Sequence, residues 1–311
     1  MADKDDKDDV QRQSVEGART LGEALRLAEA WLRAAGVNET PALDAQVTLG
    51  HVTGASRTTL LAYPERPLTA EQAARYADLI ARRAAHEPVA YLTGRREFMG
   101  IDLLVDRRAL IPRPETELLV EAALRDLAER LARDPGAPPL VADIGVGSGA
   151  IPIALAVREP RLPRIYATDI SPDALALARE NAERLGVADR ITFLLGDLLA
   201  PLPEPVDMLT ANLPYVSADD PDVPPSVSRY EPALALYGDD DHLGRGLGHI
   251  RRLLAQAPAR LRPGASLYLE FGYDQREMVE WLARDAFPDA TLRVGVDYAG
   301  WDRYIEIRLR G

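Results

Sequence analysis

Three closely spaced glycines between a predicted strand and a predicted helix constrain the fold of this 311-residue chain more than any other feature. The segment Asp143–Ala150 reads Asp-Ile-Gly-Val-Gly-Ser-Gly-Ala, after an apolar run at 140–144 and before another at 151–157. Glycine lets a backbone turn tightly and approach a ligand closely. The following helix N-terminus presents free N–H groups and partial positive charge. The segment therefore predicts a strand–turn–helix unit that binds a polar ligand.

Strands and helices alternate from residue 140 to the C-terminus. We predict strands at 140–144, 164–168, 191–195, 206–211, 266–271, 292–296 and 304–309, and helices at 151–157, 172–185, 249–261 and 275–283. Such alternation is typical of an α/β fold, in which helices cover both faces of a mostly parallel sheet, here seven-stranded. Ligands of these sheets bind at the carboxyl ends of the strands. Residues 118–311 are therefore predicted to form the catalytic domain.

The part of the chain before residue 118 has a different pattern. Residues 1–17 are polar and rich in aspartate, so we predict a disordered acidic tail. Apolar residues at helical spacing predict a small all-helical domain at 18–94, which carries no catalytic cluster and suits substrate recognition. Residues 95–117 are predicted to form a β-hairpin around Gly100 and an extended linker that contains Pro112 and Pro114.

Composition excludes several classes of site. The chain has no cysteine, which rules out disulfides and thiolate chemistry, and its four histidines lack metal-ligand spacing, so no metal is expected. The net charge of −12 argues against strong nucleic-acid binding, which depends on cationic side chains. No apolar run is long enough for a membrane span and no leader is evident, so we expect a cytoplasmic protein without membrane contact. We also expect the protein to be a monomer.

Acidic residues end three successive predicted strands, at Asp143, Asp169 and Asp197. A carboxylate at Asp169 can accept both hydroxyls of a ribose, and one at Asp197 can accept from an adenine amino group. The loop also satisfies the dinucleotide fingerprint, but a carboxylate at Asp143 would repel a pyrophosphate and suits the amino-acid end of S-adenosylmethionine, directly or through backbone amides and water. The candidate cofactor-binding residues are Asp143, Gly145, Val146, Gly147, Ser148, Gly149, Asp169, Asp197, Leu198 and Asn212.

The tetrapeptide Asn212-Leu213-Pro214-Tyr215 follows the fourth predicted strand, which places it beside the glycine loop. An amide or exocyclic amino nitrogen is a poor nucleophile because its lone pair is delocalised. The Asn212 side-chain oxygen and the Leu213 carbonyl can each accept one N–H of such a group, which fixes the nitrogen and favours its pyramidal form. Pro214 makes the turn rigid, and Tyr215 can pack on the flat face of the target. Asn212, Pro214 and Tyr215 are the catalytic candidates, and all four residues are substrate-binding candidates.

Taken together, these motifs resemble the class I (Rossmann-like) methyltransferase fold and, more closely, the protein-(glutamine-N5) methyltransferases of the HemK/PrmC type. The likeness covers residues 20–311 and includes Arg96–Phe98, Leu110–Glu117, Asp143–Gly149, Asp169, Asn212–Tyr215, Tyr230–Leu234 and Leu269-Glu270. It implies S-adenosylmethionine as cofactor and peptide chain release factors as substrates, methylated at the glutamine of a Gly-Gly-Gln motif. It also implies that Phe98, Arg113 and Glu115 line the cofactor and substrate channel.

One departure from the family leaves the target open. The usual tetrapeptide has Pro at the second position, where this chain has Leu213. Leu can serve there because the position acts through its carbonyl. Asn-Leu-Pro-Tyr is also similar to the motif of adenine-N6 methyltransferases of ribosomal RNA, and a related family methylates a glutamine of a ribosomal protein. A binding protein without catalysis is a further alternative, since no general base is evident.

Overall fold

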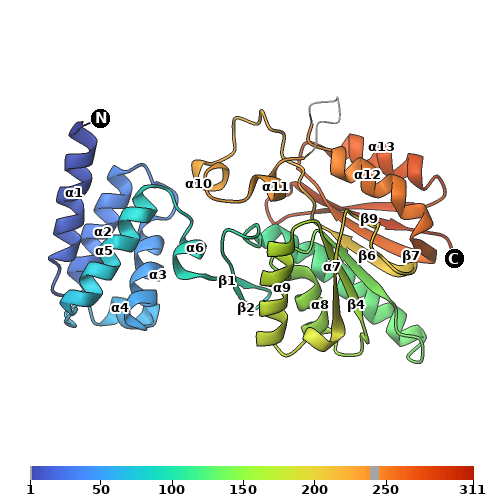
Figure 1. Cartoon of the computed structure of the whole chain (residues 1–311), viewed down its shortest axis with the longest axis horizontal. Coiled ribbons are helices and arrows are strands. Elements are labelled where there is room, and N and C mark those ends of the chain that lie inside the picture. The colour runs from blue at the N-terminus through green and yellow to red at the C-terminus, as the bar shows by residue number, and fades with distance from the viewer. Residues whose placement is uncertain (1, 239–244) are drawn as a thin grey trace. The chain divides into compact units, whose positions relative to one another are not determined.

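The computed structural model describes residues 2–238 and 245–311, and the chain divides into two compact units. The helical unit contains the residues up to Gly94 together with Pro224–Tyr230. The sheet unit contains Arg95–Val223 and Glu231–Gly311. Figure 1 shows the elements of both units.

The helical unit contains no strand among its described residues, as the sequence predicts. Its helices are α1 (Ala2–Glu16), α2 (Leu21–Ala34), α3 (Pro41–Thr53), α4 (Arg57–Ala62), α5 (Ala70–Ala84), α6 (Val89–Thr93) and α10 (Pro225–Ser228). Thr20 caps α2, and Thr69 forms a capping box with Gln72 at the start of α5. Trp31 and Tyr76 are buried in the core, where the Tyr76 hydroxyl donates to the backbone carbonyl of Ala45 at 3.0 Å. Capping and an apolar face together explain why these residues are helical.

The prediction of a disordered tail at 1–17 is wrong, because residues 2–16 form α1. Val15 is fully buried in the core of the helical unit, and Asp8 accepts a hydrogen bond from the indole of Trp31 at 3.3 Å. The helix packs along α5. Its mean composition is too polar to predict order, but one buried valine and a few cross-helix contacts provide the tertiary support that a polar helix needs.

Seven strands of the sheet unit form one sheet in the order β5-β4-β3-β6-β7-β9-β8. They are β3 (Val141–Ile144), β4 (Ile165–Asp169), β5 (Ile191–Leu195), β6 (Val206–Ala211), β7 (Leu261–Glu270), β8 (Thr291–Val296) and β9 (Asp302–Arg308). Pairing is parallel from β5 to β7 and antiparallel at β9, so the predicted sheet and its closing strand pair are confirmed. The chain order reverses on either side of β3, which opens a crevice at the carboxyl ends of β3 and β6.

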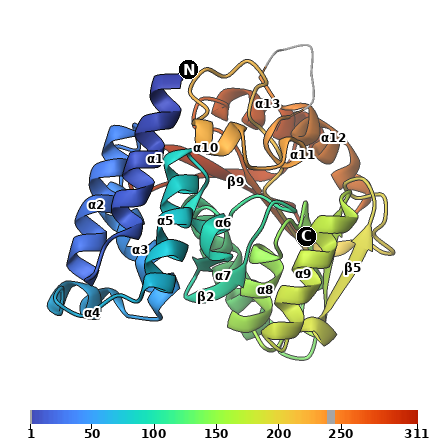
Figure 2. The ribbon, with the colours of Figure 1, turned by 60° about the vertical axis from the view of Figure 1, so that its left-hand side comes forward.

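Helices cover both faces of this sheet (Figure 2). One apolar cluster joins β3, β4 and β5 to α7 (Pro114–Arg133), α8 (Ala150–Arg158) and α9 (Pro172–Arg184). A second joins β6, β7 and β9 to α12 (Gly248–Gln256) and α13 (Arg276–Ala286). The remaining short elements are α11 (Ala233–Leu236), η1 (Ala188–Arg190) and η2 (Ala257–Ala259). The fold is thus the three-layer α/β arrangement that the sequence predicts.

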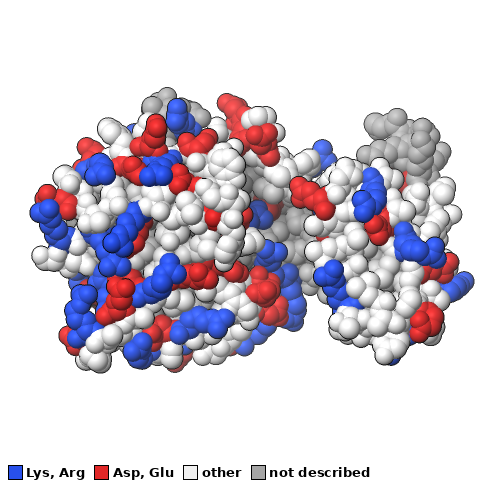
Figure 3. Space-filling view, turned by 180° about the vertical axis from the view of Figure 1, so that it is seen from behind, with Lys and Arg blue, Asp and Glu red and all other residues white. Residues whose placement is uncertain are grey.

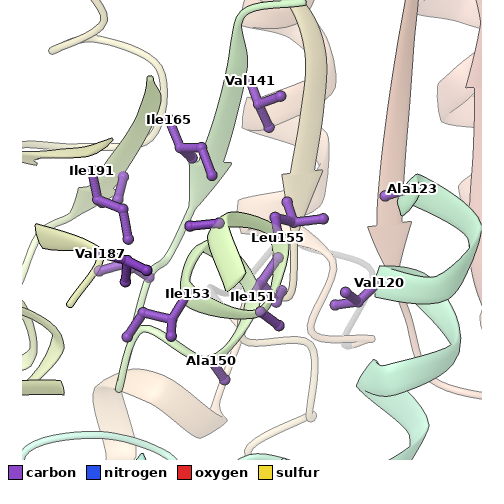
Figure 4. Packing of buried hydrophobic residues seen from close by; sticks show 14 of the residues in the cluster. Val120, Ala123, Val141, Ala150, Ile151, Ile153, Leu155, Ile165, Val187 and Ile191 are labelled. Carbon is purple, nitrogen blue, oxygen red and sulfur yellow. The ribbon is translucent and has the colours of Figure 1, made fainter. Parts of the chain in front are cut away.

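Helix α8 lies at the centre of the first cluster. Figure 4 shows its Ile151 and Leu155 among side chains from β3 and β4, with Val120 of α7 on the other side. Residues 150–156 are all buried, because this helix is apolar on every side. Close packing on both sides fixes the N-terminus of α8, and with it the glycine loop, relative to the sheet.

The two compact units and the start of helix α7 differ from the predicted domain bounds at three places. The hairpin of β1 (Arg95–Phe98) and β2 (Ile101–Leu104) belongs to the sheet unit and is not a separate linker. Helix α7 begins at Pro114 and not at residue 118, because proline is favoured in the first turn of a helix, where its missing N–H costs no hydrogen bond. The segment Pro224–Tyr230, which the sequence places in the catalytic domain, belongs to the helical unit. There the Tyr230 hydroxyl donates to the Ala85 carbonyl at 2.8 Å.

Candidate active site

The glycine loop leaves β3 and is held to the neighbouring strand by backbone hydrogen bonds. The amides of Gly145 and Val146 both donate to the Thr168 carbonyl, at 2.8 and 3.0 Å. Gly149 then turns into α8 with φ of +87°, where a Cβ would lie 2.7 Å from a side-chain carbon of Ile153. Only glycine fits that position, and the predicted strand–turn–helix unit is present.

Asp169 joins the loop to the end of β4. Its Oδ2 accepts from the Gly147 amide at 2.9 Å and its Oδ1 accepts from the Ser171 amide at 2.8 Å. Burial raises the pKa of this carboxyl, and the amide hydrogen bonds oppose that rise. The carboxylate also lines the pocket, where its remaining lone pairs can accept hydroxyl groups of a ribose.

Asp143 lies beneath the loop and is only 1% exposed. Its Oδ1 accepts from the Thr210 hydroxyl at 2.7 Å, whereas no described residue donates to Oδ2. It is not among the described residues that line the pocket, and its expected contact with the cofactor, directly or through loop amides and water, stays a prediction. Burial raises the pKa of Asp143 to about 7, despite the Thr210 hydrogen bond.

Protonation of Asp143 is expected to couple stability to pH in the cofactor-free protein. Its pKa is raised from 3.8 to about 7 in the folded state, so the folded chain holds this proton more tightly than the unfolded chain. The resulting stabilisation is present below about pH 4 and is lost as the pH rises through about 7, an effect on the order of 4 kcal/mol. Asp143→Asn should remove this part of the pH dependence in urea unfolding at about pH 5 and about pH 8. Equal pH dependence in both proteins would contradict the account.

The pocket at the carboxyl ends of β3, β4 and β6 brings together most of the predicted site residues. Those that line it are Gly145, Val146, Gly147, Ser148, Asp169, Asp197, Leu198, Asn212, Leu213, Pro214 and Arg113. Further lining residues include 108–112, Thr116 of α7, Pro232, Leu234, Ala235 and His249. Two of these segments overlap Leu110–Glu117 and Tyr230–Leu234, which only the family resemblance singles out, because they have no regular periodicity.

Besides Asp143, four predicted residues are not among the described lining residues. Gly149 turns the chain behind the loop. Phe98 is 1% exposed and packs in the core beneath the hairpin, and its expected role in lining the channel stays a prediction. Glu115 lies partly buried in the first turn of α7, outside the pocket wall. Tyr215 donates its hydroxyl to Glu270 at 3.1 Å, so its packing on a target stays a prediction.

Asp197 lines the pocket and also forms an ion pair. Its two carboxylate oxygens lie 3.2 and 3.3 Å from the guanidinium of Arg252, which also lies 3.1 Å from the Nδ1 of His249. Arg252 leaves lone pairs of the carboxylate available, so the predicted contact with an adenine amino group stays a prediction.

A buried carboxylate that the sequence assigns no role to holds two walls of the pocket together. Glu231 is 5% exposed, accepts from the guanidinium of Arg113 at 2.6 Å and accepts from the Ile111 amide at 3.0 Å. It thereby ties the 111–113 segment to the segment that begins at Pro232. Glu231 belongs to Tyr230–Leu234, which the family resemblance includes, but an acidic residue before a proline is too common to indicate a role by itself.

The tetrapeptide after β6 forms the end of the pocket. The Asn212 side chain donates through Nδ2 to the Thr116 hydroxyl at 3.0 Å, and no described residue donates to its Oδ1 or to the Leu213 carbonyl. Leu213 is 4% exposed, and a Cβ added to Gly145 would lie 3.0 Å from its Cδ2. Leucine at this position therefore packs directly on the glycine loop.

Other kinds of site find no support in the described part of the chain. Residues 2–238 and 245–311 contain no cluster of His, Asp and Glu with metal-ligand geometry. Among the described helices, none has the length and apolarity to cross a membrane. On the face shown in Figure 3, acidic and basic side chains of the sheet unit are interspersed. That face offers no continuous basic surface to a nucleic-acid backbone.

The pocket fits a nucleoside that carries an amino-acid chain. Asp169 presents a carboxylate to it, the glycine loop presents backbone, and the unpartnered oxygen of Asp143 lies just beneath that loop. The acceptor pair at Asn212 and Leu213 borders the same pocket. The fold and this site define an S-adenosylmethionine-dependent methyltransferase.

Comparison with known proteins identifies the family. Residues 23–94 match the family model described as PrmC N-terminal domain, and residues 141–234 match the model described as Methyltransferase domain. A release factor glutamine methyltransferase of Moorella thermoacetica is 48% identical over 287 residues, which covers 92% of this chain and 95% of the relative. One of Cereibacter sphaeroides is 42% identical over 288 residues, covering 92% and 98%. This chain belongs to the release factor glutamine methyltransferase family.

Proposed function

We propose that this chain methylates the side-chain N5 of the glutamine in the Gly-Gly-Gln motif of translation release factors. The observation that carries the proposal is the pair of hydrogen-bond acceptors at the end of β6, the Asn212 Oδ1 and the Leu213 carbonyl, which have no donor among the described residues. A primary amide has two N–H donors, and this pair can accept one each. Membership of the family supports a release factor as the source of that amide.

The residues act by positioning the target and by stabilising charge. S-adenosylmethionine supplies an electrophilic methyl group when it is bound. Two acceptors that hold both N–H groups fix the amide nitrogen, and their partial negative charge stabilises the positive charge that the nitrogen gains as it is methylated. The nitrogen gains one methyl group and loses one proton. Rigid backbone at Pro214 and the packing of Leu213 on Gly145 keep the acceptors in place.

Binding of the cofactor rests on the glycine loop and Asp169. The Asp169 carboxylate accepts hydrogen bonds from the amides of Gly147 and Ser171, so these polar groups of the pocket are in place before a ligand arrives. Such preorganisation lowers the entropic cost of binding. We infer that the helical unit, which carries the PrmC N-terminal match, contributes to recognition of the release factor.

The substrate can be identified by offering alternatives side by side. Purified protein with labelled S-adenosylmethionine would be given a release factor, large-subunit ribosomal proteins or ribosomal RNA. We expect label in the release factor at a rate at least about a hundredfold above the others, because a site built for one target discriminates through its hydrogen bonds. Nuclease-sensitive label in RNA would instead favour an adenine-N6 target, and label in a ribosomal protein would favour its glutamine.

A further inference from the structure

Behind the tetrapeptide, a short chain of hydrogen bonds runs from a buried carboxylate to the side chain of Asn212. The Thr116 hydroxyl of α7 donates to the Oε2 of Glu270, at the end of β7, over 2.7 Å. The Asn212 Nδ2 donates to the same Thr116 oxygen at 3.0 Å. The Tyr215 hydroxyl donates to the other Glu270 oxygen at 3.1 Å. Thr116 is 3% exposed and Glu270 is 1% exposed, so water does not compete for these partners.

The direction of each bond in this chain follows from the chemistry of Glu270. An ionised carboxylate only accepts hydrogen bonds, and a hydroxyl has a single hydrogen to donate. Thr116 must therefore give its hydrogen to Glu270 and can only accept on its other side. The side-chain amide of Asn212 has to turn its NH2 group toward Thr116, which leaves its Oδ1 as the atom available to a target.

The opposite orientation of Asn212 would place its NH2 group toward the target. Two N–H donors would then face each other, which gives no hydrogen bond and repels an incoming amide. An asparagine side chain is nearly symmetric in shape, so packing alone does not select one orientation. The hydrogen bonds from Asn212 to Thr116 and from Thr116 to Glu270 select one orientation of the Asn212 amide.

We infer that Thr116 and Glu270 are positioning residues that fix the amide of Asn212 with its Oδ1 toward the target amide. The inference rests on the proposed function, since it concerns how the same site receives its target. Neither residue touches the target in this account, and both act through Asn212.

The surroundings of Glu270 make the chain of hydrogen bonds sensitive to pH. The pKa of Glu270 is raised to about 7, mainly by burial and to a smaller extent by the nearby Glu115 of α7. The hydrogen bonds from Thr116 and Tyr215 and the charge of Arg303 on β9 act in the opposite direction. A proton on Glu270 turns the carboxyl into a donor, which allows Thr116 to donate toward Asn212 and the amide to reverse.

Substitution of Thr116 tests the inference. Thr116→Val keeps the shape and removes the hydroxyl, and should lower kcat by roughly tenfold or more with little change in the Kd for S-adenosylmethionine. Thr116→Ser restores the hydroxyl and should recover kcat to within about threefold of wild type. The matched control is Thr48→Val, because Thr48 is also fully buried but its hydroxyl has no partner among the described residues. This control should leave kcat unchanged.

A readout independent of turnover is the side-chain amide of Asn212 itself. The chain has only three asparagines, so nitrogen labelling of asparagine gives a simple spectrum. We expect Thr116→Val to shift the Asn212 amide signals and Thr48→Val to leave them in place. If wild type is active and Thr116→Val matches Thr48→Val in both kcat and amide signals, the inference is overturned. A wild type that transfers no methyl group to a release factor would instead overturn the proposed function.

Glu270→Gln provides a second test that does not depend on Thr116. Glutamine has the same shape but does not titrate, so the ratio of wild-type kcat to variant kcat should fall as the pH is lowered through about 7. Asp143 titrates in both proteins, so its contribution cancels in this ratio. A ratio that stays constant from about pH 6 to about pH 8 would contradict a role for the Glu270 charge.

Discussion

Asn212→Ala is expected to lower kcat for release-factor methylation by at least about a hundredfold, which is the typical cost of removing one group that stabilises transition-state charge. The substitution removes the Oδ1 that we expect to accept a target N–H, and it leaves the Leu213 carbonyl to hold the amide alone. Because we propose that Asn212 acts on the target nitrogen, the Kd for S-adenosylmethionine should change by less than about threefold. Single-turnover transfer and calorimetric binding would measure the two quantities separately.

The control for this variant is Asn38→Ala, at an exposed asparagine of the helical unit. It should keep wild-type kcat and cofactor affinity. Near-normal turnover of Asn212→Ala would show that the tetrapeptide is only a turn. A large loss of cofactor affinity would show that Asn212 belongs mainly to the cofactor side of the pocket.

Asp169→Ala is expected to raise the Kd for S-adenosylmethionine by at least about a hundredfold. Hydrogen bonds to a charged acceptor contribute about 1.5–3 kcal/mol each, and we expect Asp169 to accept two from the ribose hydroxyls. The variant also loses the bonds that Asp169 accepts from the amides of Gly147 and Ser171, which shape the glycine loop. Both losses act in the same direction. Titration calorimetry with S-adenosylmethionine measures the change without any protein substrate.

The matched control is Asp173→Ala, in the first turn of α9 and exposed to solvent outside the pocket. It removes an equal charge from the same side of the sheet and should leave the Kd within about threefold of wild type. If Asp169→Ala binds as tightly as this control, the ribose is held elsewhere and the assignment of Asp169 is wrong.

The sheet and the cofactor loop could be predicted because their signals are local. Alternating apolar runs give strands and helices, and the glycines after residue 144 give the turn between them. Parallel pairing then places Asp169 and Asn212 at one edge of the sheet, although neither residue shows this by itself. Asp197 reaches the same pocket for the same reason.

The support behind the site could not be predicted because it joins distant parts of the chain. Thr116 lies 96 residues from Asn212 and 154 from Glu270, and no periodicity links them. A glutamate at the end of an apolar strand, as in the run that ends at Glu270, is a usable signal, because an unpaired buried charge is costly and must have partners. The same reasoning applies to Asp143, whose depth below the loop is set by packing.

Helix α1 is a segment for which amino-acid composition predicts the wrong structure. Its residues are mostly polar and charged, which is typical of disorder. Order there depends on Val15, which is fully buried, and on contacts with α5 that only the folded unit provides. Tertiary packing overrides local propensity in such a helix.

The most direct test of the central claim is methyl transfer to a release factor and to its Gln→Ala variant in the Gly-Gly-Gln motif. Both would be incubated with this enzyme and labelled S-adenosylmethionine, and the modified peptide would be located by mass spectrometry. The account predicts one methyl group on the glutamine side chain of the wild-type factor and none on the variant. Equal methylation of both factors, or a methyl group on any other residue, would contradict it.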